Sequence, residues 1–194
     1  MENLRADLAR ARAVVEGRPL YRSLQALCAP GFQAVLVYRF GRWALRQPAL
    51  VRAPLGVIYH ALYLLVRICW GIEISRAARI GPGLYIGHLG GITVSRRAVI
   101  GRNCALSQQV TIGADAHGAP LIGDDVYIAP GARIFGRIRI GNNVKIGPNA
   151  VVGQDIPDNV VVVLDPGYHI VSFRGNRRAA STMPADGRRS ASTG

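Results

Sequence analysis

The stretch that decides the fold runs from residue 121 to residue 154 and reads LIGDDVYIAPGARIFGRIRIGNNVKIGPNAVVGQ. An aliphatic residue recurs at every sixth position, at Ile122, Ile128, Ile134, Ile140, Ile146 and Val152. A period of six matches neither an α-helix nor a β-strand. It suits a triangular coil, in which each hexad forms one flat side and three hexads close a turn of about 18 residues. The stretch therefore predicts a solenoid whose aliphatic side chains point inward and stack from turn to turn.

The same series extends towards the N-terminus with two interruptions. It starts at Ile74, Ile80 and Ile86, slips by two residues, and resumes at Val94, Ile100, Leu106 and Ile112. A second interruption spans residues 114–121. Glycine often follows the aliphatic residue, and we expect it to allow a tight corner. Cys104 occupies one of the small inward positions, which predicts a buried, unreactive thiol.

The regions on either side of the repeat lack this period. Residues 1–70 predict an α-helical region, with breaks near Gly17–Pro19, Pro30–Gly31, Pro48 and Pro54. The repeat domain is predicted over residues 71–173. Residues 174–194 are small, polar and basic, and predict a disordered tail.

The excess of positive charge indicates which classes of partner the protein could bind. The chain has 194 residues, with 24 Lys and Arg against 11 Asp and Glu, and a formal net charge of +13. Such a surface attracts nucleic acid, anionic lipid or an anionic cofactor. The sequence contains no recognition-helix, zinc-finger or aromatic RNA-binding signature, so we expect no nucleic-acid partner.

Cysteine usage and hydropathy bear on the compartment. Three scattered cysteines predict neither a disulfide scaffold nor a metal site, and favour a reduced, cytoplasmic setting. Residues 2–18 have no apolar centre, so we expect no secretory signal there. The apolar run from Ala53 to Val66 is shorter than the roughly 20 residues of a membrane-spanning helix. It predicts core or subunit packing, or peripheral contact with the inner membrane surface.

Two groups of motifs resemble one family. Residues 30–39, PGFQAVLVYR, together with Trp43 resemble the helical segment of serine acetyltransferases. That family's catalytic domain is followed in order by residues 71–74, 80–88, 98–101 and 109–113. The resemblance covers residues 20–175. It implies a left-handed parallel β-helix of the hexapeptide-repeat type, preceded by the N-terminal α-helical region.

The resemblance also implies a catalytic pair. The family's catalytic histidine corresponds to His88 and its partner carboxylate to Glu73, fifteen residues earlier and nearly one coil away. His88 is expected to take the proton from an acceptor hydroxyl, and Glu73 to orient the imidazole. Backbone N–H groups near Gly113 and Ala114 are expected to stabilise the oxyanion.

Acetyl-CoA is the co-substrate that the resemblance implies, without a metal. In this family it binds along the coils between neighbouring subunits of a homotrimer, and a dimer of trimers is the larger alternative. The matching cofactor-binding positions are Gly113, Ala114, Tyr127, Pro130, Gly131, Lys145 and Pro148.

The acceptor side departs from the family pattern. Serine enzymes of this family place an aspartate directly before the catalytic histidine, where this chain has Gly87. Arg96 and His117 stand at other expected substrate-binding positions. Loss of a buried charge partner costs roughly 2–5 kcal/mol of binding. We therefore expect transfer to a sugar hydroxyl in polysaccharide biosynthesis, a reading that the similarity of residues 166–176 to a polysaccharide-linked branch supports. Serine O-acetylation in cysteine synthesis and a non-catalytic scaffold on the same fold are the two alternatives.

Overall fold

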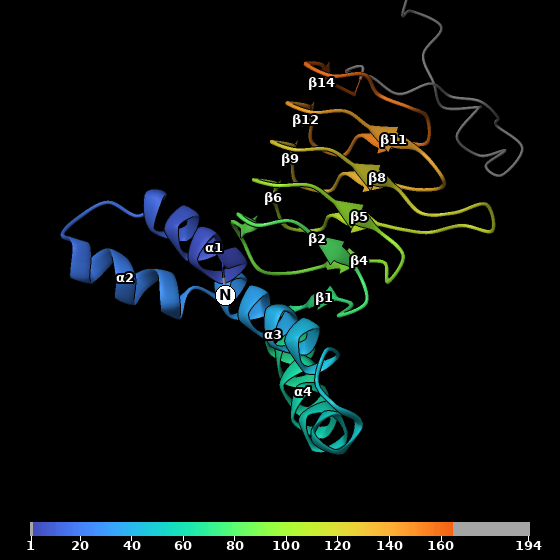
Figure 1. Cartoon of the computed structure of the whole chain (residues 1–194). Helices are drawn as coiled ribbons and strands as arrows, with labels where there is room; N and C mark the ends of the chain where they lie inside the picture. Colours follow the sequence, from blue (N-terminus) through green and yellow to red (C-terminus); the bar gives the residue numbers. More distant parts are fainter. Residues whose placement is uncertain (1, 165–194) are drawn as a thin grey trace, which may run out of the picture. The chain divides into compact units, whose positions relative to one another are not determined.

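A computed structural model describes residues 2–164 of the chain. The N-terminal part consists of four helices, and all of them lie in the region where the sequence predicts helix (Figure 1). They are α1 (Glu2–Ala13), α2 (Pro19–Cys28), α3 (Pro30–Ala44) and α4 (Ala49–Trp70). Helices α2 and α3 both begin at a proline, whose fixed φ suits the first helical position.

Helix α4 differs from the prediction of a break near Pro54. The helix continues through this proline, which lies in its second turn. Proline removes one backbone donor, so the carbonyl of Leu50 loses its helical partner. Both residues are exposed, and water can satisfy that carbonyl. The sequence interpretation overestimated the cost of proline so near a helix start.

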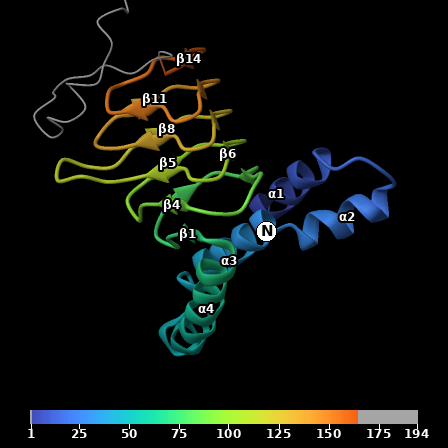
Figure 2. The same ribbon diagram turned by 180° about the vertical axis from the view of Figure 1, so that it is seen from behind.

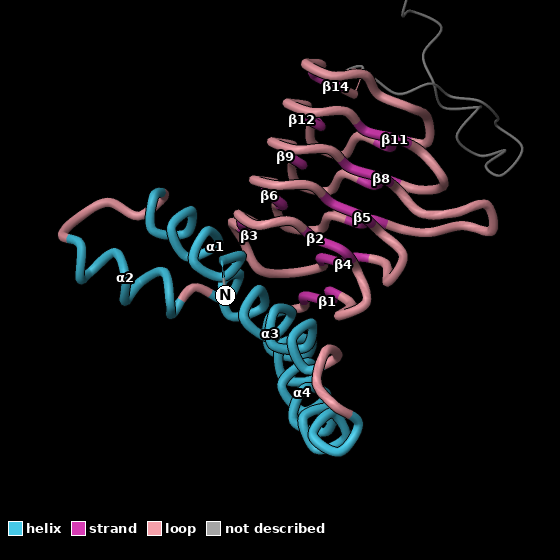
Figure 3. Tube along the Cα trace, in the orientation of Figure 1, coloured by secondary structure: helices cyan, strands magenta, loops and turns pink. Residues whose placement is uncertain are grey.

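Residues 72–162 form fourteen short parallel strands separated by turns (Figure 3). They pair into three sheets, and each sheet contains every third strand along the chain. Sheet A contains β1 (Ile72–Ile74), β4 (Ile92–Val94), β7 (Thr111–Ile112), β10 (Arg133–Ile134) and β13 (Val151–Val152). Sheet B contains β2 (Arg79–Ile80), β5 (Val99–Ile100), β8 (Leu121–Ile122) and β11 (Arg139–Ile140). Sheet C contains β3 (Tyr85–Ile86), β6 (Ala105–Leu106), β9 (Tyr127–Ile128), β12 (Lys145–Ile146) and β14 (Val161–Val162).

The chain therefore visits the three sheets in turn, as a left-handed parallel β-helix, and the predicted fold is confirmed. The coils stack in sequence order from β1 to β14, which is visible from both sides (Figures 1 and 2). Every aliphatic residue of the predicted series is buried. In sheet A they form one column of stacked partners: Ile74, Val94, Ile112, Ile134 and Val152.

Several of the glycines that follow the aliphatic residues allow neighbouring coils to approach closely. Gly101 has an ordinary negative φ, but a Cβ built on it would lie 2.5 Å from the carbonyl oxygen of Gly123 in the next coil. No side chain fits at that separation. Several left-handed corner positions are instead occupied by asparagine, as at Asn103 and Asn143. The prediction that these glycines relieve corner strain is therefore wrong at Gly101, where the spacing between coils decides.

The helical region is joined to the first coil by a buried ion pair. Asp7 of α1 is fully buried and lies 2.8 Å from Nε of Arg39 on α3. Its Oδ1 also accepts hydrogen bonds of 2.8 Å from the backbone N–H groups of Gly83 and Leu84, just before β3. Arg39 in turn donates to the carbonyl oxygens of Ile80 and Gly81. One carboxylate therefore ties two helices to the turn that leads into β3.

Two predictions extend beyond the described residues. The predicted repeat domain, residues 71–173, is described as far as residue 164. The predicted tail, residues 174–194, lies entirely outside the described residues. The motif at residues 166–176 also lies beyond residue 164.

Candidate functional site

Several predicted site residues gather along the edge where sheet C turns into sheet A, which we call the catalytic edge. Successive turns carry His88, Gln108, Pro130 and Pro148, one in each coil. Backbone hydrogen bonds connect these turns. Gln109 donates to Gly90 (2.8 Å), Gly131 to Gln108 (3.1 Å) and Asn149 to Pro130 (2.9 Å). The edge is therefore continuous from His88 to the upper coils.

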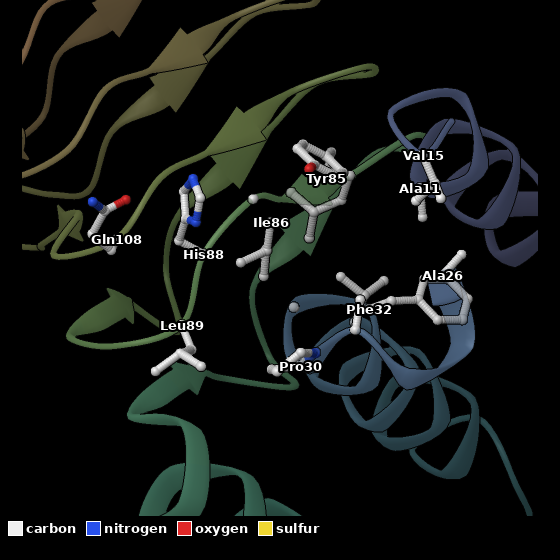
Figure 4. Close-up of a pocket in the computed structure, with 15 residues that line it drawn as sticks. Ala11, Val15, Ala26, Pro30, Phe32, Tyr85, Ile86, His88, Leu89 and Gln108 are labelled. Carbon is white, nitrogen blue, oxygen red and sulfur yellow. The ribbon is translucent and has the colours of Figure 1, made fainter. Parts of the chain in front are cut away.

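His88 is one of the residues that line a pocket between the helical region and the first coils (Figure 4). The pocket has a volume of about 460 Å³. Its apolar wall comes from the first three helices and the turns between them: Ala11, Val15, Ala26, Ala29, Pro30, Phe32 and Val35. The opposite wall is the segment of residues 84–89. The His88 side chain is exposed, so its imidazole is open to a substrate.

Gln108 is a site residue that the sequence interpretation missed. Its side chain lines the same pocket as His88 (Figure 4). Among the described residues, its Oε1 is the single buried side-chain oxygen or nitrogen without a hydrogen-bond partner. A buried acceptor left unpaired costs about 1–3 kcal/mol, which a ligand donor can recover. The sequence could have indicated Gln108 only through its position in the turn that lies one coil above the turn of His88.

Glu73 forms its ion pair with a residue other than His88. It lies in β1, and its Oε2 is 3.4 Å from Nε of Arg67 on α4. Among residues 2–164, neither Glu73 nor any other residue forms a hydrogen bond or an ion pair with His88. Desolvation together with the Glu73 carboxylate raises the pKa of Tyr63 to about 12. Arg67 competes for the carboxylate, and the role of Glu73 in orienting the imidazole stays a prediction.

Five of the predicted cofactor-binding residues lie on sheet C or on the catalytic edge. Tyr127 and Lys145 are register partners in β9 and β12, and both side chains are exposed. The Tyr127 hydroxyl accepts a 3.3 Å hydrogen bond from Ser107. The remaining three, Pro130, Gly131 and Pro148, occupy the edge itself. Together they form a strip that leads away from His88 and ends near an exposed ammonium group.

The other predicted residues lie at a different edge, where sheet A turns into sheet B, which we call the loop edge. Gly113, Ala114 and His117 belong to the long loop between β7 and β8, and Arg96 belongs to the turn after β4. The loop is closed by Asp115, whose Oδ1 accepts 2.8 Å hydrogen bonds from the N–H groups of His117 and Gly118. One chain therefore does not bring these four residues to His88.

Gly87 precedes His88 and has room for a side chain. A Cβ there would meet the Tyr85 ring at 3.4 Å, an ordinary contact, and its φ is not left-handed. The missing aspartate of the family pattern therefore reflects no steric constraint at this position.

Comparisons with known proteins show what this chain is similar to. Residues 119–154 match the family described as bacterial transferase hexapeptide (six repeats). This chain carries the hexapeptide repeat of bacterial transferases. It is 37% identical over 145 residues to a serine acetyltransferase of Synechococcus elongatus, covering 73% of this chain and 57% of the relative. A serine acetyltransferase of Staphylococcus epidermidis is 43% identical over 117 residues, covering 58% of this chain and 54% of the relative.

Solved structures give the same assignment of fold. A serine acetyltransferase of Neisseria gonorrhoeae in complex with serine has a TM-score of 0.70 at 32% identity, covering 84% of this chain and 66% of that one. Isoform 3 from Entamoeba histolytica, in complex with cysteine, has a TM-score of 0.71 at 25% identity, covering 93% and 63%. The chain thus spans a little over half the length of the curated relatives it matches.

These findings correct the expected acceptor. The prediction of a sugar hydroxyl in polysaccharide biosynthesis is wrong, because the relatives are serine acetyltransferases and solved neighbours hold serine or cysteine. The prediction relied on the missing aspartate at Gly87. Gln108, whose side chain lines the same pocket, carries an uncharged acceptor, the buried Oε1, which has no hydrogen-bond partner among the described residues.

Proposed function

We propose that the protein is a serine O-acetyltransferase, which moves the acetyl group of acetyl-CoA to the hydroxyl of L-serine. The observation that carries this proposal is the position of His88. It is exposed and lines a pocket on a β-helix similar to serine acetyltransferases. No metal takes part in the proposed reaction.

The reaction needs one proton acceptor. Neutral His88 takes the proton of the serine hydroxyl while the hydroxyl oxygen attacks the thioester carbonyl carbon. The resulting oxyanion needs a backbone N–H donor, for which Ala114 is the candidate. The other predicted donor, Gly113, gives its N–H to the carbonyl oxygen of Ile134 at 2.8 Å. When the C–S bond breaks, the imidazolium returns its proton to the CoA thiolate. Atoms and charge balance without a further co-reactant.

Gln108 supplies an acceptor for the amino group of the substrate. An ammonium donates hydrogen bonds, and the unpaired, buried Oε1 of Gln108 belongs to a side chain that lines the pocket together with His88. A hydrogen bond to a charged group contributes about 1.5–3 kcal/mol, more than a neutral pair. This contact replaces part of what an aspartate at residue 87 would provide.

A homotrimer is part of the proposal, because the site residues of one chain lie on two edges. His88, Tyr127 and Lys145 belong to the catalytic edge or to sheet C, whereas Gly113 and Ala114 belong to the loop edge. When a second copy places its loop edge beside the catalytic edge of the first, all of these site residues come together. Rings of identical heterologous contacts close in this way.

The central experiment measures loss of the acetyl-CoA thioester by its absorbance. Thiol reagents are avoided because Cys28 and Cys69 are exposed. We expect turnover with L-serine and a decrease in kcat of about 100-fold or more for His88→Ala, with CoA binding retained. An inactive wild-type protein would contradict the proposal, as would an active His88→Ala variant. His60→Ala is the matched control, since His60 is exposed on α4 and its Nδ1 pairs with the carbonyl of Gly56.

A second experiment tests the role of Gln108. Gln108→Met removes the acceptor with little change in volume. We expect the KM for L-serine to rise about 10- to 150-fold, while the KM for acetyl-CoA stays near the wild-type value. Gly87→Asp should lower the KM for L-serine, because it adds a carboxylate beside the ammonium. An equal effect on both KM values would show that Gln108 does not bind the amino group.

A third experiment tests whether two copies share one site. His88→Ala and Ala114→Trp should each be inactive alone, since the first lacks the base and the second blocks the loop edge. After mixing under conditions that exchange subunits, some sites combine an intact catalytic edge with an intact loop edge. Activity should then reappear. Continued inactivity in exchanged mixtures would mean that each chain works alone.

A further inference from the structure

The outward face of helix α4 is apolar and exposed. The helix has 22 residues and a mean hydropathy of 1.6 over its most apolar window, of which only 11% is buried. At 1.5 Å per residue it is about 33 Å long, enough to cross a bilayer by length and composition alone. Its exposed large apolar side chains are Leu50, Val51, Val57, Ile58, Leu62, Leu64, Leu65 and Ile68.

Helical spacing separates this face from the side that packs on the protein. Tyr59 and Val66, seven residues apart, are the buried side chains of α4. Val57, Leu64 and Ile68 lie on the opposite side of the helix, and Leu50 continues the same line. The polar residues His60 and Arg67 occupy one flank. A soluble monomer rarely leaves an apolar strip of this length in water, so we expect a partner to cover it.

The charge around α4 indicates the chemistry of that partner. Residues 17–72 contain seven arginines and no aspartate or glutamate. Within the described chain, two of the seven form ion pairs, Arg39 with Asp7 and Arg67 with Glu73. Of the remaining five, Arg42, Arg46 and Arg52 belong to α3, α4 and the turn between them, whereas Arg18 and Arg22 lie at the start of α2. A second copy docking on this face would bring the same uncompensated arginines, whereas an anionic surface would neutralise them.

A groove beside α4 is lined by both apolar side chains and arginines. It has a volume of about 1090 Å³ and extends from α3 to strands β2 and β5. Apolar side chains line it, including Leu62 of α4 and the half-exposed Trp43. Arg42, Arg46 and Arg79 also line it and form no ion pair among residues 2–164. Arginine beside tryptophan and aliphatic side chains is typical of sites at the level of lipid headgroups.

We propose that α4 and the adjoining arginines dock the protein on the surface of a bilayer that contains anionic lipid. The apolar face of α4 lies in the interface, and the arginines contact headgroup phosphates. The helix lies on the membrane and does not cross it, because its C-terminal half is attached to the protein. Tyr59 is buried under Arg76, Arg67 pairs with Glu73, and Gly71 leads directly into β1. In Figures 1 and 2, α4 extends away from the coils beyond β1. This docking is independent of the proposed serine chemistry.

The experiment is co-sedimentation of the full chain with vesicles. Phosphatidylcholine vesicles are compared with vesicles that also contain phosphatidylglycerol, at low and high salt. We expect binding to the anionic vesicles that weakens with salt. Val57→Gln with Leu64→Gln should weaken binding about tenfold or more by removing apolar contacts. Arg42→Gln with Arg46→Gln should weaken it and flatten the salt dependence.

Matched controls and a competing outcome complete the design. Val161→Gln with Val163→Gln removes two equally exposed valines at the far end of the coils and should bind like the wild type. Light scattering without vesicles tests the second-copy alternative. Equal binding to both vesicle types, wild-type binding by the α4 variant, or a dimer that only the α4 variant dissociates would overturn the proposal. Serine turnover is measured in parallel, so failure of docking is distinguished from failure of the enzyme.

Discussion

Asp7→Ala tests the attachment of the helices to the first coil. The carboxylate of Asp7 is fully buried, and the side chain of Arg39 is only 10% exposed. Removing the carboxylate leaves a buried guanidinium without its charge partner and the N–H groups of Gly83 and Leu84 without an acceptor. Breaking a buried pair on one side costs about 3–5 kcal/mol. We therefore expect the free energy of unfolding to fall by about that amount, and the Tm by about 6–20 °C.

The measurement is urea unfolding followed by circular dichroism, with hydrogen exchange to locate the loss. Glu16→Ala is the control, since Glu16 is an exposed acid in the turn after α1 and has no ion pair within residues 2–164. Asp7→Asn should lie between Asp7→Ala and the wild type, because the amide keeps an acceptor but not the charge. A loss below about 1 kcal/mol for Asp7→Ala would refute the reasoning, because the pair would then behave as an exposed one.

Two further predictions concern the coils. Gly101→Ala forces a Cβ to within 2.5 Å of the Gly123 carbonyl oxygen and should destabilise the protein by about 1–3 kcal/mol in urea unfolding, whereas Gly153→Ala, which meets nothing within 4 Å, should not. Desolvation raises the pKa of the Cys104 thiol from 9.0 to about 11, so the folded state favours the neutral thiol; the associated stability is complete below pH 9 and is lost as the pH rises towards 11. Alkylation of the native protein at neutral pH, read by mass, should therefore modify two cysteines, Cys28 and Cys69, and a third only after unfolding.

The sequence predicted the coils well because their determinant is local and repeated. The aliphatic period fixes which residues point inward, and stacking requires only that neighbouring coils keep the same phase. The same argument placed Cys104 inside. It gave the wrong reason for Gly101, since the distance between two backbones in adjacent coils is not visible in a hexad.

The candidate site was less accessible to sequence reasoning. His88 was found through a resemblance, but the pocket beside it depends on helices from the other end of the chain. Gln108 carries no motif of its own, and its importance comes from an unpaired oxygen in three dimensions. The predicted cofactor-binding residues lie on two different edges of the β-helix. Their spacing in the sequence alone did not show this.

The position of His88 in the first coil connects catalysis with the helical region. Strands β1, β2 and β3 each stand at the end of their sheet, so the first coil has a neighbouring coil on one side only. In a solenoid, stability comes from nearest neighbours, and an end coil needs a cap. Helices α1 and α3 provide that cap through Asp7 and Arg39, and they also form the pocket wall opposite His88. Loss of the cap should therefore reduce turnover at urea concentrations where the upper coils remain folded, because His88, the proposed proton acceptor, belongs to the least supported coil.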